Sequence, residues 1–490
     1  MTGAPATIAL SLISHTNAGK TTLARTLLRR DVGEVRDAPH TTSEPARYPL
    51  IESPEGDALL LWDTPGFGDS ARLARRLAQQ GNPVGWFLSE VWDRYRDRTF
   101  WLTQQAVRNV RDQADVVLYL VNASEPPEDA GYLGPELDVL RWIGKPVLVL
   151  LNQVGAPRPA EVEAAEVDRW RAALATRDEV ATVLPLDAFA RCWVQELALF
   201  AAIGEVLPPA TRAPFARLAT AWRAQRIAQF DAAMTAIATA LAEAAVDSAV
   251  LPPESFVDRL RRSVGAAREA EAAPVVASLD ALAARLETAL FAADDRMIAL
   301  HGLDGRSAGE ALARVAADVA TDAPLDERRA AVMGGLLSGA LTGLGADLAA
   351  GGLTFGAGML AGALVGALGG AGVARGVNVV RGKSATTVRW QEPFLDRQLT
   401  LALLRYLAVA HFGRGRGEFA AGEIPAHWRE RTEQRVADAR EALAEVWALR
   451  SAEGGSADLA PRLATMLREI ALALLRDLYP NALPEEAAAS

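Results

Sequence analysis

Residues 6–28 read ATIALSLISHTNAGKTTLARTLL, an apolar run followed directly by a glycine-lysine-threonine loop and a helix-like segment. Within this stretch, residues 14–21 match the pattern G-x-x-x-x-G-K-[ST], in which backbone N–H groups and a helix N-terminus bind phosphate. Ser14 stands in place of the first glycine. We expect Lys20 to reach the β- and γ-phosphates of a nucleotide and the Thr21 hydroxyl to bind Mg²⁺. The stretch therefore predicts a strand, a phosphate-binding loop and a helix.

Two further segments follow in the order that such a site requires. Asp63-Thr64-Pro65-Gly66 comes directly after an apolar run, so the Asp63 carboxylate can bind the water shell of the metal and the Gly66 amide can point at a γ-phosphate. Thr41-Thr42 lie between the first helix and the second strand, where Thr42 can close over Mg²⁺. Three elements in this order argue against a chance match of the loop.

Apolar runs of strand length alternate with amphipathic stretches over the first two hundred residues, which predicts an α/β domain. The turn-rich segment Ser53–Asp57 predicts an antiparallel hairpin between the second and third strands. Helix-length segments separate the other strands and predict parallel pairing. We therefore expect an α/β P-loop domain over residues 1–207, with a mostly parallel sheet and one antiparallel hairpin strand. The expected strands are Ile8–Ile13, Ala46–Ile51, Leu59–Trp62, Val116–Val121, Val147–Leu151 and Val183–Leu186.

After Pro208-Pro209 the strand pattern stops and helical spacing takes over. We expect an all-α region made of a helical domain over 208–330, a glycine-rich helical hairpin over 331–376 and a C-terminal helical segment over 377–490. This last segment reads as three helices from about Trp390 onward.

Glycine recurs at every fourth position in the predicted hairpin, the spacing that lets membrane helices pack closely. Residues 348–374 carry no charge, which exceeds the roughly 20 residues needed to cross a bilayer. This pattern favours membrane contact through 331–376, and a close-packed hairpin buried in a helical domain is the alternative. The glycines concerned are Gly335, Gly339 and Gly343, then Gly358, Gly362, Gly366 and Gly370.

Charge and cysteine content bear on partners and compartment. The net charge of −10 argues against wholesale nucleic-acid binding, so no nucleic-acid partner is expected. The one cysteine, Cys192, allows no internal disulfide, which fits a reducing cytoplasm. Thr7–Ile13 is too short for a signal peptide. We expect a cytoplasmic protein, either free, peripheral to the inner membrane or inserted in it.

A segment rich in tryptophan and arginine, residues 70–114, is longer than a minimal helix at this place requires. Interleaved aromatic and basic residues can bind nucleic acid, a membrane surface or a protein partner. Because the segment follows Gly66, a docking surface for a protein partner, gated by the nucleotide, is the functional interpretation. The alternative is that Trp86, Trp92 and Trp101 pack internally while the arginines face solvent.

On these motifs the chain resembles the Era- and TrmE-like P-loop GTPases of the translation-factor class. Residues 14–22 are similar to their G-x-x-N-x-G-K-S/T-x loop, Pro39–Thr42 to their P-G-T-T segment and Asp63–Gly66 to their D-T-P-G segment. The whole chain resembles a bacterial group that joins such a domain to an uncharacterised helical C-terminal domain. Gly85–Leu88, Val91–Arg94 and Leu151–Gln153 carry this second resemblance.

The resemblance implies a GTPase that binds GTP and GDP with Mg²⁺. It implies catalytic roles for Lys20, Thr42 and Gly66, and Mg²⁺ binding by Thr21, Thr42 and Asp63. Asn17 matches the asparagine that coordinates K⁺ in several members, so a potassium ion is one hypothesis, and the alternative is that Asn17 only braces the loop. The nucleotide-binding residues that the resemblance implies are Asn17, Ala18, Gly19, Lys20, Thr21, Thr22, Asn152, Gln153, Asp187 and Ala188.

Two positions depart from the family's pattern. Glycine at position 155 replaces the aspartate of the guanine-reading N-K-x-D motif. The lost hydrogen bonds are each worth about 1.5–3 kcal/mol, so guanine selectivity should weaken. Asp187 either substitutes for this aspartate or caps the next helix. Phe67 stands where Ras-like enzymes carry the glutamine that orients water, so slow intrinsic hydrolysis is expected.

We therefore expect a GTP-binding, slowly hydrolysing switch coupled to a helical effector domain that engages a membrane or a protein partner, with oligomerisation left open. Two alternatives belong to other classes of protein. One is a nucleotide-gated scaffold that does not hydrolyse. The other is a membrane-inserting protein that its nucleotide domain regulates.

Overall fold

The computed structural model describes residues 5–15, 18–29, 46–64, 66, 70–78, 97–190, 192–251, 266–303, 377–381, 386–412, 424–451, 456–480 and 482. The chain divides into two compact units. Unit 1 contains Met1–Ala228, Ala410–Glu418 and Leu475–Ser490, and unit 2 contains Gln229–Val409 and Phe419–Leu474. The domain limits of the sequence analysis stay predictions.

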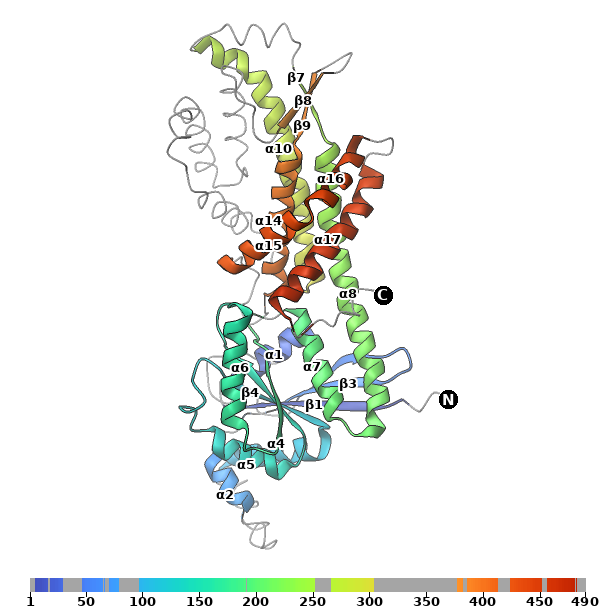
Figure 1. Cartoon of the computed structure of the whole chain (residues 1–490). Coiled ribbons are helices and arrows are strands. Elements are labelled where there is room, and N and C mark those ends of the chain that lie inside the picture. The colour runs from blue at the N-terminus through green and yellow to red at the C-terminus, as the bar shows by residue number, and fades with distance from the viewer. Residues whose placement is uncertain are drawn as a thin grey trace. The chain divides into compact units, whose positions relative to one another are not determined.

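Unit 1 is built on a six-stranded sheet with the strand order β2-β3-β1-β4-β5-β6 (Figure 1). Only β2 and β3 pair in antiparallel fashion, and every other neighbouring pair is parallel. The predicted fold class of this domain is therefore confirmed. The strands are β1 (Thr7–Ser14), β2 (Ala46–Glu52), β3 (Ala58–Asp63), β4 (Val116–Asn122), β5 (Val147–Asn152) and β6 (Val180–Pro185).

Helices cover both faces of this sheet, which explains why β1, β4 and β5 are continuous apolar runs. One face packs against α2 (Ser70–Ala78), α4 (Arg98–Gln113), α5 (Leu133–Ile143) and α6 (Ala160–Leu174). The other face packs against α1 (Lys20–Leu28), α7 (Trp193–Val206) and the first part of α8 (Pro209–Val246). The parallel arrangement brings the loops after β1, β4 and β5 to one edge of the sheet.

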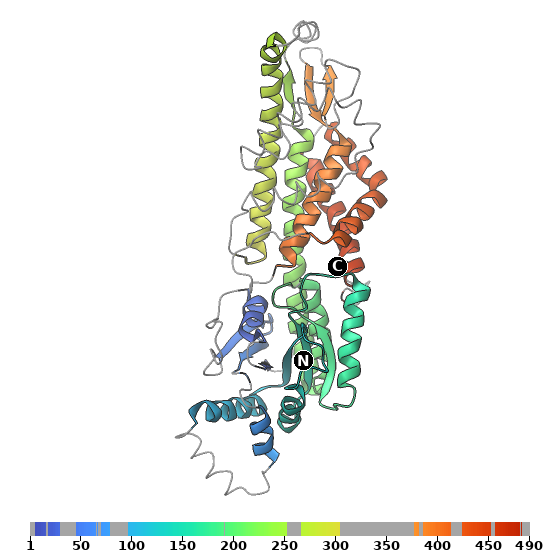
Figure 2. The same ribbon diagram turned by 90° about the vertical axis from the view of Figure 1, so that its left-hand side faces the viewer.

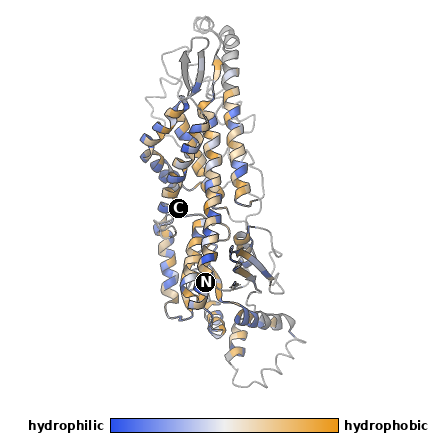
Figure 3. Cartoon of the chain, turned by 90° about the vertical axis from the view of Figure 1, so that its right-hand side faces the viewer, coloured by the Kyte–Doolittle hydropathy of each residue, from blue (hydrophilic) through white to orange (hydrophobic). Residues whose placement is uncertain are grey.

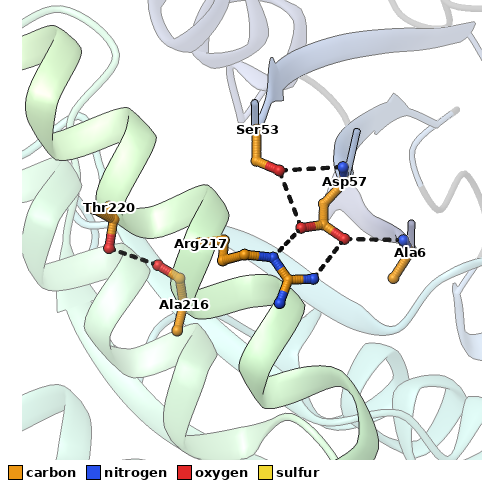
Figure 4. A network of polar contacts seen from close by, with 6 residues as sticks. All are labelled: Ala6, Ser53, Asp57, Ala216, Arg217 and Thr220. Carbon is orange, nitrogen blue, oxygen red and sulfur yellow. Dashed lines mark hydrogen bonds and ion pairs between the residues drawn. The ribbon is translucent and has the colours of Figure 1, made fainter. Parts of the chain in front are cut away.

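A partly buried ion pair fastens the β2–β3 hairpin to α8 (Figure 4). Asp57 is fully buried and accepts hydrogen bonds from Arg217 Nε at 2.6 Å and Arg217 Nη2 at 3.0 Å. The Ala6 amide and the Ser53 hydroxyl donate to the same carboxylate, each at 3.0 Å. The hydrogen bonds from Arg217 are the main reason that the pKa of Asp57 falls to about 2.

Helix α7 starts immediately after the protein's one cysteine. Cys192 is buried and forms no disulfide; it occupies the N-cap position, and its backbone N–H donates to the Gln195 side chain at 3.0 Å. This contact fixes the start of the helix, because it satisfies a backbone donor near the helix terminus.

Unit 2 is mainly helical, as the sequence analysis predicted for this part of the chain. Helix α10 lies beside α14, and the long helices carry both hydrophilic and hydrophobic residues along their length (Figures 2 and 3). The elements after α8 are α10 (Ala266–Leu300), α14 (Glu392–Ala410), α15 (Ala426–Asp438), α16 (Arg440–Ala448), the 3-10 turn Leu449–Ser451 and α17 (Ser456–Leu478).

A small antiparallel sheet interrupts this helical pattern and was not predicted. It consists of β7 (Ala249–Leu251), β9 (Thr386–Trp390) and β8 (Val377–Arg381), in that order. Its strands have three to five residues, and β7 pairs with a strand that lies far along the chain. A local sequence pattern does not reveal such a long-range pairing.

A buried ion pair joins α10 to α14 inside unit 2. Arg405 Nε lies 3.2 Å from Asp294 Oδ1, and both side chains are only 2% exposed. Burial raises the pKa of Asp294, and Arg405 opposes that rise.

Several predictions fall outside the described residues. These include the glycine-rich segment 331–376 and Trp86 and Trp92 of the 70–114 segment. In the part of the chain that the structure describes, no helix is long and apolar enough to cross a bilayer.

Candidate nucleotide-binding site

The loop between β1 and α1 holds its lysine in a partly buried position. Gly19 has a φ of +86°, and a Cβ atom there would lie only 2.7 Å from Asn152 Nδ2, so glycine is required. Lys20 Nζ donates to Ser14 Oγ at 3.3 Å. Burial lowers the pKa of Lys20, and the nearby Asp63 carboxylate partly opposes this effect. The loop thus shields a cation from bulk water. In this less polar surrounding the cation would attract phosphate charge more strongly than it would in water.

Serine fits at position 14 because the backbone there needs no left-handed conformation. Ser14 ends β1, is fully buried and is absent from the described residues with positive φ. Its hydroxyl donates to the His15 carbonyl at 2.5 Å and accepts from Lys20. The missing first glycine therefore imposes no strained backbone at position 14.

Thr21 and Asp63 form a pair suited to Mg²⁺. The Thr21 hydroxyl donates to Asp63 Oδ2 at 2.7 Å, and Asp63 is 1% exposed. Burial raises the pKa of Asp63. Within the described residues, Asp63 Oδ1 is buried and has no hydrogen-bond partner. A hydroxyl beside a carboxylate with an unused oxygen matches the oxygen ligands that Mg²⁺ prefers, so the two residues could hold the ion or its water shell.

Gly66 lies against the same lysine. A Cβ atom at this position would meet the Ser14 carbonyl oxygen at 3.1 Å and Lys20 Nζ at 3.2 Å. A side chain here would fit only if the phosphate loop shifted by a few tenths of an ångström, so glycine favours this close approach of the backbone after β3. The Thr64 hydroxyl donates to the Leu12 carbonyl and fixes the start of this segment.

Asn152 joins the phosphate loop to the loop after β6. Its Nδ2 donates to the Ala18 carbonyl at 2.7 Å, and its Oδ1 accepts from the Ala188 amide, also at 2.7 Å. The side chain is fully buried. Three of the predicted nucleotide-binding residues are thus brought together by one amide group. Gln153 follows with a φ of +59°, and Thr22 is buried in the first turn of α1.

Asp187 is engaged with its own surroundings. Its two oxygens accept the backbone N–H groups of Val154, at 2.8 Å, and of Phe189, at 2.7 Å. Asp187 thus organises the loops after β5 and β6. The predicted alternative, that it caps the next helix, is wrong, because Cys192 is the N-cap residue of α7. Gly155 has a φ of +89° and nothing within 4 Å of the place where a Cβ atom would be. Gly155 and Asp187 line one pocket together with Glu163 and Tyr479.

A buried carboxylate beside the phosphate loop was missed by the sequence analysis. His15 Nδ1 lies 2.7 Å from Glu136 Oε1, and the Tyr119 hydroxyl donates to Glu136 Oε2 at 2.7 Å. The available signals were a histidine inside the phosphate loop and a glutamate in a mostly apolar helix segment. Nothing local connects the two, because 121 positions separate them. Asn17, Thr41, Thr42 and Phe67 lie outside the described residues.

Family models match both parts of the chain. Residues 10–153 match the model described as 50S ribosome-binding GTPase, MMR_HSR1. The fold and this match therefore define a P-loop GTPase domain over residues 10–153, and P-loop GTPases in general use Mg²⁺. Residues 171–470, which are 300 of the 490, match the model described as a domain of unknown function, DUF3482. The chain belongs to the DUF3482 family.

Solved structures of GTPases show limited similarity. An Era variant of Aquifex aeolicus bound to GDP and AlF4⁻ is 19% identical with a TM-score of 0.29, and the match covers 41% of this chain and 57% of that one. Era in complex with MgGDPNP and nucleotides 1506–1542 of 16S ribosomal RNA is 19% identical with a TM-score of 0.29, and the match covers 42% and 58%. The chain thus spans little more than half the length of these Era chains.

The chloroplast translocon components atToc33 and psToc159 give a similar result. Their structure is 15% identical with a TM-score of 0.26, and the match covers 41% of this chain and 83% of that one. No curated protein matches the chain.

Proposed function

We propose that this protein is a GTP-hydrolysing switch with a low intrinsic rate, whose helical C-terminal part is the effector. The observation that carries the proposal is the buried pair of Thr21 and Asp63, with the partly buried Lys20, beside Gly66. A desolvated cation, a hydroxyl–carboxylate pair and a closely approaching backbone are the parts that phosphoryl transfer needs.

Each residue has a distinct role in this proposal. Lys20 neutralises charge on the β- and γ-phosphates, and the Gly66 amide contacts the γ-phosphate. Thr21, Thr42 and Asp63 hold Mg²⁺ or its water shell. When bound, Mg²⁺ would neutralise the charge that develops on the phosphates. Asn152 holds the phosphate loop and the loop after β6 at a fixed distance from each other.

The 70–114 segment is the proposed docking surface for a protein partner. It begins four positions after Gly66. If Gly66 moves when the γ-phosphate is lost, the start of this segment would move with it. Its described ends are joined, because Arg72 Nη1 lies 2.5 Å from Asp97 Oδ2 and the Arg72 guanidinium lies over the Phe100 ring at 3.8 Å. Movement of α2 would therefore carry the start of α4 with it.

Membrane contact is proposed for the glycine-rich segment 331–376 on its sequence alone. Ribosome binding is not proposed, although the description of one matching family model names the 50S ribosome. The acidic chain, with a net charge of −10, offers no general basic footprint for RNA.

The test is calorimetric titration of the full chain with GDP, GTP, ADP and ATP in Mg²⁺, followed by single-turnover hydrolysis of GTP. We expect binding of the guanine nucleotides and slow release of phosphate. Lys20→Ala should weaken GDP binding at least about 100-fold, because a buried charge contact to phosphate is lost.

Lys145→Ala removes a lysine outside the site and is the matched control, so its GDP affinity should equal that of the wild type. Equal loss in both variants, or no binding of any nucleotide, would contradict the proposal. Tight binding without any turnover would favour the non-hydrolysing scaffold.

A separate prediction, based on Asn17, is that GTP hydrolysis depends on potassium. We expect faster GTP hydrolysis in K⁺ than in Na⁺ at the same ionic strength, because the ion would supply positive charge at the phosphates. Asn17→Ala should remove the difference. Equal rates in the two salts for the wild type would refute the hypothesis.

A further inference from the structure

The histidine of the phosphate loop is held by side chains from outside the loop. His15 Nδ1 lies 2.7 Å from Glu136 Oε1, and the His15 ring stacks on Tyr132 with centroids 4.5 Å apart and an angle of 18° between the planes. The Tyr119 hydroxyl donates to the other oxygen of Glu136 at 2.7 Å. One nitrogen and one face of the His15 ring are therefore engaged by the N-terminal part of α5.

The core of unit 1 holds Glu136 at the place where it reaches the loop. Its side chain is fully buried on the face of α5 that also buries Leu133, Leu137 and Leu140. These leucines belong to the core on this face of the sheet. Burial raises the pKa of Glu136, and the hydrogen bonds that it accepts oppose this rise. Because a buried carboxylate usually adds less to stability than a well-packed apolar side chain, its contact with the loop explains this residue better than stability does.

The backbone of His15 takes part in the internal contacts of the loop. The Ser14 hydroxyl donates to the His15 carbonyl at 2.5 Å, and the Ala18 amide donates to the same carbonyl at 3.4 Å. At the far end of the loop, Asn152 Nδ2 donates to the Ala18 carbonyl at 2.7 Å. Glu136 thus fixes the start of the loop as Asn152 fixes its end.

The anchored start of the loop borders the proposed phosphate site. A Cβ atom on Gly66 would lie 3.7 Å from the His15 carbonyl carbon and 3.2 Å from Lys20 Nζ. Lys20 begins α1 directly after the loop. A loop that is already held in its binding conformation loses less conformational freedom when phosphate binds, so its affinity is higher.

We propose that Glu136 is a positioning residue for nucleotide binding, which acts through His15 to hold the phosphate loop in the conformation that receives the phosphates. This inference rests on the proposed function. It requires neither side chain to touch the nucleotide or to transfer a proton. The effect should appear in the affinity for GDP, and it should depend on the hydrogen bond to His15 rather than on the charge of Glu136.

Two substitutions at position 136 separate the hydrogen bond from the charge. Glu136→Leu and Glu136→Gln both remove the negative charge, but only glutamine keeps an oxygen that can accept from His15 Nδ1. In titration calorimetry of the full chain with GDP and Mg²⁺, Glu136→Leu should bind about tenfold more weakly than the wild type, and Glu136→Gln should differ less than about threefold. Equal losses in the two variants would assign the effect to the charge and overturn the inference.

A double-mutant cycle tests whether Glu136 acts through His15. His15→Ala should weaken GDP binding about tenfold, and so should the double variant with Glu136→Leu, because both changes break the same contact. His15 is 37% exposed, so its removal tests the inference even if the buried Glu136→Leu does not fold. A loss near 100-fold in the double variant, or wild-type affinity of His15→Ala, would overturn the inference.

Glu161→Leu, in the exposed first turn of α6, is the matched control and should leave GDP affinity unchanged. Thermal unfolding shows whether each variant is folded. Any of the contradicting results together with GDP binding by the wild type would overturn this inference alone. A wild-type chain that binds no guanine nucleotide would overturn the proposed function and this inference with it.

Discussion

The position that matches the guanine-reading aspartate of Era- and TrmE-like GTPases is occupied by glycine in this protein. Gly155 has a φ of +89° and no neighbour within 4 Å of a Cβ atom, so a side chain has space although the backbone is strained for it. We predict that Gly155→Asp discriminates GDP from IDP about tenfold better than the wild type. IDP lacks the 2-amino group, and one hydrogen bond to a charged oxygen is worth about 1.5 kcal/mol, which is about tenfold in affinity.

Gly144→Asp is the control for backbone strain. Gly144 also has a positive φ, of +68°, and open space around its Cβ position, but it lies in the turn between α5 and β5. Titration calorimetry of both variants measures the ratio of GDP to IDP affinity. An unchanged ratio in Gly155→Asp would mean that the base does not lie beside position 155.

The ion pair of Asp57 predicts acid sensitivity of unit 1. Because its folded pKa of about 2 lies below the ordinary value of 3.8, the pair stabilises the fold above about pH 4 and loses this effect as the pH falls toward 2. Asp57→Asn should lower the free energy of unfolding by about 2 kcal/mol at pH 7 and by less at pH 3.

Thermal unfolding followed by circular dichroism at several pH values measures this difference. Asp168→Asn breaks an exposed pair with Arg171 and should change stability little at any pH. A constant difference between Asp57→Asn and the wild type from pH 7 to pH 3 would show that the carboxylate charge does not matter.

The sequence predicts individual site residues where one local motif defines their role. Lys20, Thr21 and Asp63 stand in such motifs, and the structure brings them together. The His15–Glu136 contact could not be predicted in this way, because it depends on the packing of α5 against the end of β1.

Among the elements, α10 and α14 depend on a charged contact in the core of unit 2. Arg405→Met would leave Asp294 buried without its partner and should destabilise the chain by about 3–5 kcal/mol. Adding Asp294→Leu should recover most of this loss, because a buried apolar pair avoids the cost of desolvating two charges.

Urea unfolding of the single and double variants tests this prediction. Arg285→Met removes the partially exposed pair with Asp247 in the same unit and should cost less than about 1 kcal/mol. If Arg405→Met is no more destabilising than Arg285→Met, the buried pair does not hold the two helices together.

Helices and strands could be predicted from the sequence when they were long and their apolar residues followed a regular pattern. The six strands of the large sheet have six to eight residues each, are mainly apolar except for β2, and lie between turn or helix signals; all six were predicted. The three-stranded sheet was not, since its strands are short and follow no clear alternation. The middle C-terminal helix is also broken at Ala439, between α15 and α16, where the sequence shows no glycine or proline.

For the whole molecule, the glycine-rich segment predicts nucleotide-dependent membrane binding. We expect the chain to float with anionic lipid vesicles more strongly in a non-hydrolysable GTP analogue than in GDP. Gly362→Asp places a charge in the uncharged run and should reduce flotation, because a charge is costly in the bilayer interior. Gly305→Asp, outside that run, is the control, and equal flotation of all forms would contradict the prediction.

The buried cap of α7 makes the protein convenient for spectroscopy. Cys192 is the one thiol in the chain and is fully buried, so maleimide reagents should leave the native protein unlabelled. A cysteine introduced at the exposed Arg75 on α2 would then carry the sole fluorophore. Its emission could follow the motion of that helix as GTP binds and phosphate leaves, without any further engineering of the chain.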